Sequence, residues 1–327
     1  MPWVVYDPSH TRHLPRTEIL YGRPLPHPER PERVEAIRQA LSGTPWEAGI
    51  VPPRAYPLAL AHSVHDPKYV EHLSARALEA DDEGLDGEWF PYVFERDRSL
   101  DTGTPIRRET PEFAWASGRV SLTGADLILE GAPAAYALCR PPGHHASHGA
   151  SGGYCYFNNA ALAAVRFLAN ASSRVAILDL DIHHGNGTQD IFYASSSVLY
   201  CSIHGDPEWA YPPHTGLATE RGTGGGAGFT YNQPLPVGTD WPHYATALDL
   251  ALERIARFKP EQIVLSQGFD TFEGDRWGGF LLHAEDYTEI ARRVRAQGAP
   301  VLAVLEGGYE PANTAAGSLA LLEGLSG

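Results

Sequence analysis

The stretch Arg174–Asp190, "RVAILDLDIHHGNGTQD", joins an apolar run to a cluster of ionisable side chains. "VAILDL" has the nearly continuous apolar character of a strand that is covered on both faces. Asp179 and Asp181 stand where such a strand should carry valine or isoleucine, and His183 follows. Alternate residues of a strand share a side, so these three side chains are expected to face the same way. Neighbouring buried carboxylates are costly unless a cation or a proton compensates them, so the stretch predicts a charged site at a strand end.

Five short apolar runs share this layout, each ending in a polar or glycine-rich cluster. They span residues 134–139, 175–180, 197–203, 262–267 and 300–305, with helix-like stretches at 159–169, 244–258 and 285–297. Strands that alternate with helices predict an α/β fold with a central, mostly parallel sheet flanked by helices on both faces. Ligand sites in such sheets lie outside the carboxyl ends of the strands, where all five clusters stand.

The first 130 or so residues are less regular. Residues 27–41 are typical of a helix opened by prolines, and residues 64–73 can start another. Residues 81–112 are acidic and contain prolines, with little periodicity. We therefore expect a long surface segment near the mouth of the site, at about 81–121. No linker divides the chain, so a single domain over residues 1–327 is expected.

Composition narrows the class of protein. The net charge of −15 argues against binding to nucleic acid through phosphates. It would suit a cationic substrate, although a solubilising surface is the simpler interpretation. No apolar run is long enough to span a membrane, and the N-terminus lacks the apolar centre of a signal peptide. Three widely spaced cysteines do not suggest a disulfide framework, so a cytoplasmic protein is expected.

Asp270, at the end of "IVLSQGFD", offers a partner for Asp181 and His183. Two carboxylate oxygens and one imidazole nitrogen, with one position open, are typical of a catalytic zinc site. Fe²⁺ or Co²⁺ can use the same ligands. The simpler alternative is that Asp181 and His183 form a polar pair that satisfies itself at a strand end, without a metal. A third ligand at another strand end favours a metal site.

Two further motifs stand at the same edge. "RPPGHH" carries His144 and His145, and imidazole is the usual group for proton transfer near neutral pH. "EGGY" places Tyr309 after two glycines, where a phenol can donate to a developing oxyanion. We interpret His148 and His184 as structural.

Two other motifs, one typical of a serine nucleophile and one of a phosphate-binding loop, lack the sequence context that their functions require. "GASGG" matches a serine-nucleophile pattern around Ser151, but that turn requires a strand directly before it and here a histidine loop precedes it. The glycine-rich run at 222–229 lacks the Gly-Lys-Ser/Thr of a phosphate-binding loop. We interpret it as a flexible loop.

The motifs "RPPGHHA", "DLDIHHGNGTQDIF", "SIHG", "GFDTFEGD" and "LEGGY", in this order, resemble the zinc-dependent histone deacetylase family. The bacterial acetylpolyamine amidohydrolase-like branch and the class II-like enzymes are most similar. The resemblance implies an arginase/deacetylase fold with one catalytic Zn²⁺ per chain, held by Asp181, His183 and Asp270. It also implies a structural K⁺, held by Asp179, Asp181, His183, Ser202 and Ile203.

The resemblance also assigns roles to the remaining polar residues. His145 would act as general base and then as general acid, and His144, paired with Asp179, would be its electrostatic partner. Tyr309 would polarise the amide carbonyl together with the metal. Asn186 stands where class I enzymes carry the aspartate that orients the second histidine, as in class II and polyamine-deacetylase relatives.

The substrate-binding positions follow from the same motifs. Gly153, Tyr154 and Tyr211 would line a narrow tunnel suited to a slender acyl-amine chain. Trp277 matches a rim position. Asp101 is a candidate rim acid that could hold a substrate N–H group or a cation.

Together these features predict zinc-dependent hydrolysis of the acetyl amide of a long amine, with release of acetate. The substrate would be a small acetylated amine, such as an acetylpolyamine, or an acetyl-lysine peptide. Two alternatives are a catalytically silent acyl-amine-binding protein on the same fold and a metal-free serine hydrolase using Ser151. Self-association as a dimer or tetramer is left open.

Overall fold

The computed structural model describes residues 1–94, 96–170 and 172–327. At its centre is an eight-stranded sheet in the order β4-β1-β5-β10-β9-β6-β7-β8, in which every neighbouring pair is parallel. The strands are β1 (Trp3–Val5), β4 (Ile50–Val51), β5 (Ala134–Ala137), β6 (Val175–Asp179), β7 (Val198–Gly205), β8 (Thr230–Leu235), β9 (Gln262–Gln267) and β10 (Val301–Leu305). A separate antiparallel hairpin joins β2 (Thr17–Leu20) to β3 (Arg23–Pro26).

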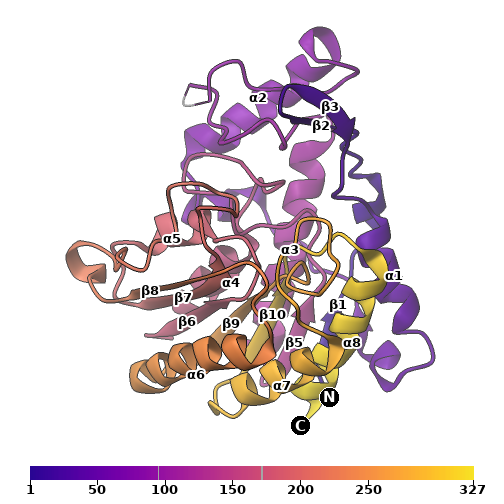
Figure 1. The fold of residues 1–327 in the computed structure, drawn as a ribbon. Helices are drawn as coiled ribbons and strands as arrows, with labels where there is room; N and C mark the ends of the chain where they lie inside the picture. The colour runs from indigo at the N-terminus through magenta and orange to yellow at the C-terminus, as the bar shows by residue number, and fades with distance from the viewer. Residues whose placement is uncertain (95, 171) are drawn as a thin grey trace.

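Helices cover both faces of the sheet (Figure 1). One apolar core forms beneath α1 (Glu32–Ala40), α6 (Trp241–Phe258), α7 (Ala284–Arg295) and α8 (Pro311–Ser326). The other lies beneath α2 (Pro67–Glu83), α3 (Thr110–Leu129) and α4 (Asn159–Leu168). The short α5 (Asn186–Phe192) follows β6. Figure 1 shows the β2–β3 hairpin and α2 together at one end of the molecule, away from the α6–α7 layer.

Alternating side chains explain why the strands are apolar throughout. In β6, Ala176 and Leu178 enter the first core, while Val175 and Ile177 enter the second. This two-sided burial is what a parallel sheet between helix layers requires. The alternation continues past the end of β6, because Leu180 and Ile182 also pack in the first core. Asp179 and Asp181 are thereby turned to the opposite side.

The five predicted strands and three predicted α/β helices are confirmed, and the α/β architecture with them. Three strands of the large sheet (β1, β4 and β8) and the hairpin were not predicted. The interpretation of residues 110–121 as surface segment was wrong, because they form the first part of α3, which is buried on most sides. A helix that is buried nearly all round, with serines and threonines among its buried residues, shows no clear amphipathic period from which to recognise it.

Cys139, Cys155 and Cys201 are free thiols in the interior. Burial raises the pKa of all three, in the case of Cys201 to about 12. Among the described residues, no helix combines the length and the apolar character needed to cross a lipid bilayer.

Candidate metal centre and active site

Asp181, His183 and Asp270 meet at the carboxyl edge of the sheet. Their potential ligand atoms all lie within 4.8 Å of one another. His183 Nδ1 is 3.1 Å from Asp181 Oδ1 and 3.1 Å from Asp270 Oδ2. The residues follow β6 and β9, which are neighbours in the sheet, so the strand order brings them together. The predicted ligand set is therefore assembled in one place.

Backbone N–H groups hold the outer oxygens of the two carboxylates. Gly307 N donates to Asp181 Oδ2 at 2.7 Å, and Ile182 N donates to Asp270 Oδ1 at 3.0 Å. One oxygen of each carboxylate is thus left facing His183. Only glycine fits at 307, because a Cβ there would lie 2.0 Å from Asp270 Oδ2.

The electrostatics of this cluster favour a cation. Burial alone would lower the pKa of His183, but Asp181 and Asp270 raise it to about 10. Burial, with the charge of Asp181, raises the pKa of Asp270 to about 7. Two fully buried carboxylates need a positive charge between them, and a divalent ion can replace the protons that otherwise supply it. The donor set fits a metal ion of the zinc type.

The two histidines of the "RPPGHH" loop have different polar partners. His144 Nδ1 lies 3.2 Å from Asp179 Oδ2, and His145 Nδ1 lies 2.7 Å from Asn186 Oδ1. Their ring centroids are 4.0 Å apart. An amide oxygen only accepts hydrogen bonds, so Nδ1 of His145 carries the hydrogen and Nε2 is its basic nitrogen. The pairings expected from the resemblance are present.

The surroundings push the pKa values of these histidines apart. Burial, reinforced by His144 and His183, holds the pKa of His145 well below its ordinary value. Burial also acts to lower the pKa of His144, but Asp179, Asp181 and Glu306 raise it to about 10. One imidazole is therefore neutral and its neighbour charged, a difference that divides acid and base roles between them.

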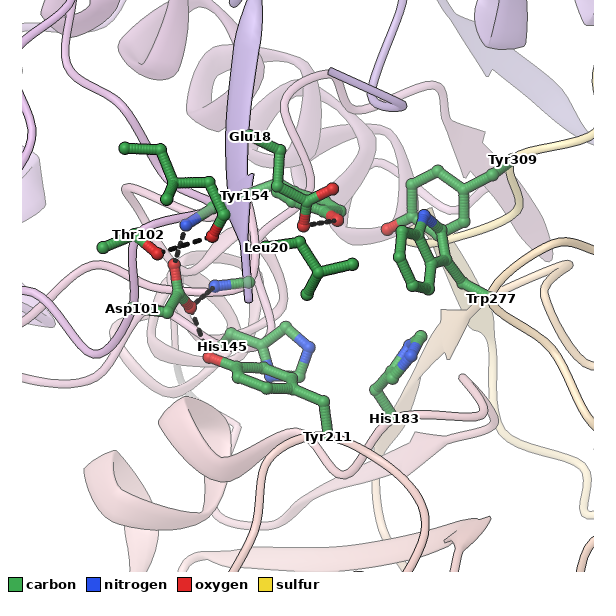
Figure 2. A pocket seen from close by; sticks show the side chains of 13 residues that line it. Glu18, Leu20, Asp101, Thr102, His145, Tyr154, His183, Tyr211, Trp277 and Tyr309 are labelled. Atoms are coloured by element: carbon green, nitrogen blue, oxygen red, sulfur yellow. Dashed lines mark hydrogen bonds between the residues drawn. The ribbon is translucent and has the colours of Figure 1, made fainter. Parts of the chain in front are cut away.

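A pocket leads to this cluster (Figure 2). All five predicted substrate-binding residues line it, as do His145, His183 and Tyr309. The ring of Tyr211 packs edge-on against His145 at a centroid distance of 5.0 Å, and Tyr154 packs likewise against Tyr309 at 5.7 Å. The lining residues missed from the sequence are Glu18, Ile19, Leu20, Thr102 and Gly103.

Asp101 holds the pocket walls together. Its Oδ1 accepts from Gly103 N and Thr104 Oγ1, both at 2.9 Å. Its Oδ2 accepts from Gly153 N at 2.7 Å and from Tyr211 OH at 2.6 Å. Asp101 thus lines the pocket as predicted, but both of its oxygens are already engaged by the protein.

The β2–β3 hairpin forms part of the pocket wall, and no sequence motif predicted this role. Tyr154 OH donates to Glu18 Oε1 at 2.8 Å. Ile19 exchanges two hydrogen bonds with Thr102, of 3.3 and 2.7 Å. Burial raises the pKa of Glu18, although the bond from Tyr154 opposes this. A carboxylate therefore stands in the pocket wall beside the aromatic side chains.

Tyr309 is held from its backbone and from its ring. Its N–H donates to Asp275 Oδ2 at 2.6 Å, and the Arg33 guanidinium lies 4.9 Å from the ring centroid. Arg33 also donates to the carbonyl oxygen of Gly308. Burial holds the pKa of Tyr309 well above its ordinary value, so its hydroxyl remains a hydrogen-bond donor.

The residues expected to hold potassium lie beside the metal centre. Ser202 pairs in register with Asp179 across β6 and β7, and Ser202 and Ile203 are fully buried. Ser202 Oγ lies 2.8 Å from His204 Nδ1. Potassium at this position stays a prediction.

Ser151 is buried and does not line the pocket. Its Oγ donates to the Arg98 carbonyl at 3.5 Å, and no histidine is among its hydrogen-bond partners in the described part of the chain. Among the described residues, Ser151 therefore has no base of the kind that a nucleophilic serine needs.

The two histidines interpreted as structural bind other groups. His148 Nδ1 lies 2.8 Å from Val64 O, and His184 Nε2 lies 3.2 Å from Gln189 Oε1.

Comparisons with known proteins point to one family. The model of the histone deacetylase domain matches residues 27–325. Acetylpolyamine amidohydrolase 1 of Pseudomonas aeruginosa is 36% identical over 99% of this chain and 98% of its own. The acetylpolyamine amidohydrolase of Mycoplana ramosa is 38% identical over 99% of both chains. The crystal structure of acetylpolyamine aminohydrolase from Burkholderia pseudomallei superposes with a TM-score of 0.94 at 35% identity, covering 100% of this chain and 99% of that one.

The chain therefore belongs to the histone deacetylase domain family. It is an enzyme of the deacetylase type, an amidohydrolase with a candidate metal site.

Proposed function

We propose that this enzyme is a zinc-dependent amidohydrolase that removes the acetyl group from a long amine and releases acetate. The observation that carries the proposal is the convergence of the Asp181–His183–Asp270 cluster, His145 and Tyr309 on one pocket. When bound, Zn²⁺ supplies Lewis-acid polarisation and lowers the pKa of a water molecule. We assign the site one ion of zinc, with potassium beside Asp179.

The side chains of the pocket supply the proton transfers. His145 Nε2 accepts the proton of the attacking water and later returns it to the departing amine nitrogen. Charged His144, against Asp179, stabilises the negative charge that accumulates during attack. The Tyr309 hydroxyl donates to the oxygen of the former carbonyl as it becomes an oxyanion.

An acetylated polyamine is the substrate that best suits the pocket. Tyr154 and Tyr211 form aromatic walls that suit a slender alkyl chain, and Glu18 places a carboxylate in the same wall. A second amine further along the chain would be drawn to that charge and to the net charge of −15. The relatives named acetylpolyamine amidohydrolases, similar over nearly the whole chain, support the same choice.

The test compares three substrates on the zinc-loaded enzyme, with and without a chelator. These are acetylputrescine, an acetyl-lysine peptide and N-butylacetamide, which has the carbon chain of acetylputrescine without its free amine. We expect chelator-sensitive turnover, with kcat/KM highest for acetylputrescine. A peptide preference of about tenfold or more would overturn the substrate assignment.

The same assay separates the alternatives. Activity that survives the chelator would point to a metal-free hydrolase. Zinc bound at one ion per chain without turnover of any acetylated amine would contradict the deacetylation proposal. A silent acyl-amine-binding protein would then show ligand binding alone, which calorimetry detects.

A further inference from the structure

Glu306 is a buried carboxylate that takes no direct part in the mechanism above. It follows β10 directly and is fully buried. Its Oε2 accepts from the backbone N–H groups of Gly143, at 2.7 Å, and His144, at 3.1 Å. Its Oε1 accepts from Ser266 Oγ at 2.6 Å. This one side chain ties together the ends of β5, β10 and β9, which are consecutive in the sheet.

The backbone of Glu306 is itself firmly held. Its N–H donates to Gln267 O at 2.9 Å, and its carbonyl accepts from the Arg33 guanidinium. The carboxylate therefore projects toward the histidine loop from a fixed point of the sheet. Fixed acceptors of this kind are able to set the position of a neighbouring loop.

The histidine loop needs such an acceptor. Pro141 and Pro142 precede Gly143 and have no N–H groups, so they donate no backbone hydrogen bonds, although the Pro141 carbonyl accepts from Ser117 and Asn159. Without Glu306, the N–H groups of Gly143 and His144 would be buried without partners, at a cost of about 1–3 kcal/mol for each group. The loop could reduce that cost by shifting until these N–H groups found other partners. Such a shift would move the two imidazoles away from their positions at the metal ligands.

We propose that Glu306 is a positioning residue that fixes the two histidines relative to the metal ligands by accepting the N–H groups at the start of their loop. This proposal rests on the proposed function. The property of Glu306 that matters in this proposal is its ability to accept hydrogen bonds, and not its negative charge.

Two variants separate acceptance from charge. In Glu306→Gln, the amide oxygen can accept both backbone N–H groups while the amide nitrogen donates to Ser266. Glu306→Met has similar length but no oxygen. A matched control is Glu310→Met on the same loop, where the wild-type side chain is only partly buried and makes no capping hydrogen bond to α8.

The measurements are kcat, KM, zinc content and Tm on the zinc-loaded enzyme with acetylputrescine. We expect Glu306→Met to lose about 100-fold in kcat, because a displacement of the order of 1 Å in a reacting group costs that much. KM and zinc content should remain unchanged. Glu306→Gln should keep kcat within about threefold, and the control should match the wild type.

A readout independent of turnover is the Nδ1–H signal of His145 in proton–nitrogen spectra, which reports its bond to Asn186. That signal should move in Glu306→Met and stay in place in Glu306→Gln. Equal losses in both variants, or wild-type kcat in Glu306→Met, would overturn the proposal. If the wild type does not deacetylate amines, the proposed function fails, but the spectra still decide the position of the loop.

Discussion

The metal centre and the pocket walls are built in different ways. Asp181, His183 and Asp270 stand directly after two strands that neighbour each other, so the sheet order alone brings them together. The walls come from distant segments joined by side-chain hydrogen bonds, such as the one from Tyr211 to Asp101 across 110 positions of sequence. The centre therefore depends on the fold itself, whereas the walls depend on a few cross-links. Substitutions in the two regions should accordingly have different effects.

The largest effect is expected from Asp181→Asn at the metal centre. Loss of a charged ligand should remove most of the bound zinc and lower kcat/KM by about a thousand-fold or more, because the metal contributes several kcal/mol to the transition state. Zinc content and turnover are the measurements. Full zinc content at the wild-type rate would contradict the ligand assignment.

Tyr309→Phe tests the point where the pocket reaches the metal centre. Removing one oxyanion donor should lower kcat by about 10²–10³-fold. KM and zinc content should stay close to those of the wild type, because the ring and its contact with Arg33 are retained. If KM rose while kcat held, Tyr309 would belong to the substrate-binding wall instead.

Glu29→Gln tests the buried ion pairs that Glu29 forms with Arg33 and Arg140. Glu29 Oε1 is 2.8 Å from Arg140 Nε and 2.9 Å from Arg33 Nη1, and all three side chains are fully buried or nearly so. Burial acts to raise the pKa of Glu29, but Arg140 and Arg33 lower it from 4.5 to about 2. Its contribution to stability is therefore complete above pH 4.5 and is lost as the pH falls toward 2.

We expect Glu29→Gln to lower the free energy of unfolding by about 3 kcal/mol at pH 7, since it leaves buried arginines unpaired. The difference from the wild type should shrink as the pH falls from 4.5 to about 2. Denaturant unfolding at pH 7 and pH 3 measures both quantities. A difference that is the same at both pH values would rule out the ion-pair explanation.

Glu18→Gln should have the smallest effect, confined to the pocket wall. The amide oxygen can still accept from Tyr154, so the wall stays in place. KM for acetylputrescine should rise about fivefold, the equivalent of about 1 kcal/mol, with kcat unchanged. N-Butylacetamide provides the control, because it lacks the amine and its KM should not change. An equal rise for both substrates would show that the wall, and not its charge, had been altered.

This contrast also explains what the sequence could predict. Asp181 and His183 are two residues apart and Asp270 ends another recognisable strand, so the strand-end rule placed all three ligands. Glu18 was not predicted to line the pocket, because its hydrogen bond with Tyr154 spans 136 positions and no local sequence pattern encodes it. β1 and β4 are too short to show a period, with three and two residues. α3 was missed for a different reason, since it is buried on nearly all sides and serines and threonines are among its buried residues, so it shows no clear amphipathic period.

The burial of all three thiols has a practical consequence for spectroscopy. A maleimide dye reacts with exposed thiolates, and this interior offers none among the described cysteines. Tyr21, at the tip of the β2–β3 hairpin, is 94% exposed and adjoins Leu20 of the pocket. A cysteine introduced there would be a single attachment point for a fluorophore. Its emission could then report how this wall responds when an amine enters, without prior removal of the native cysteines.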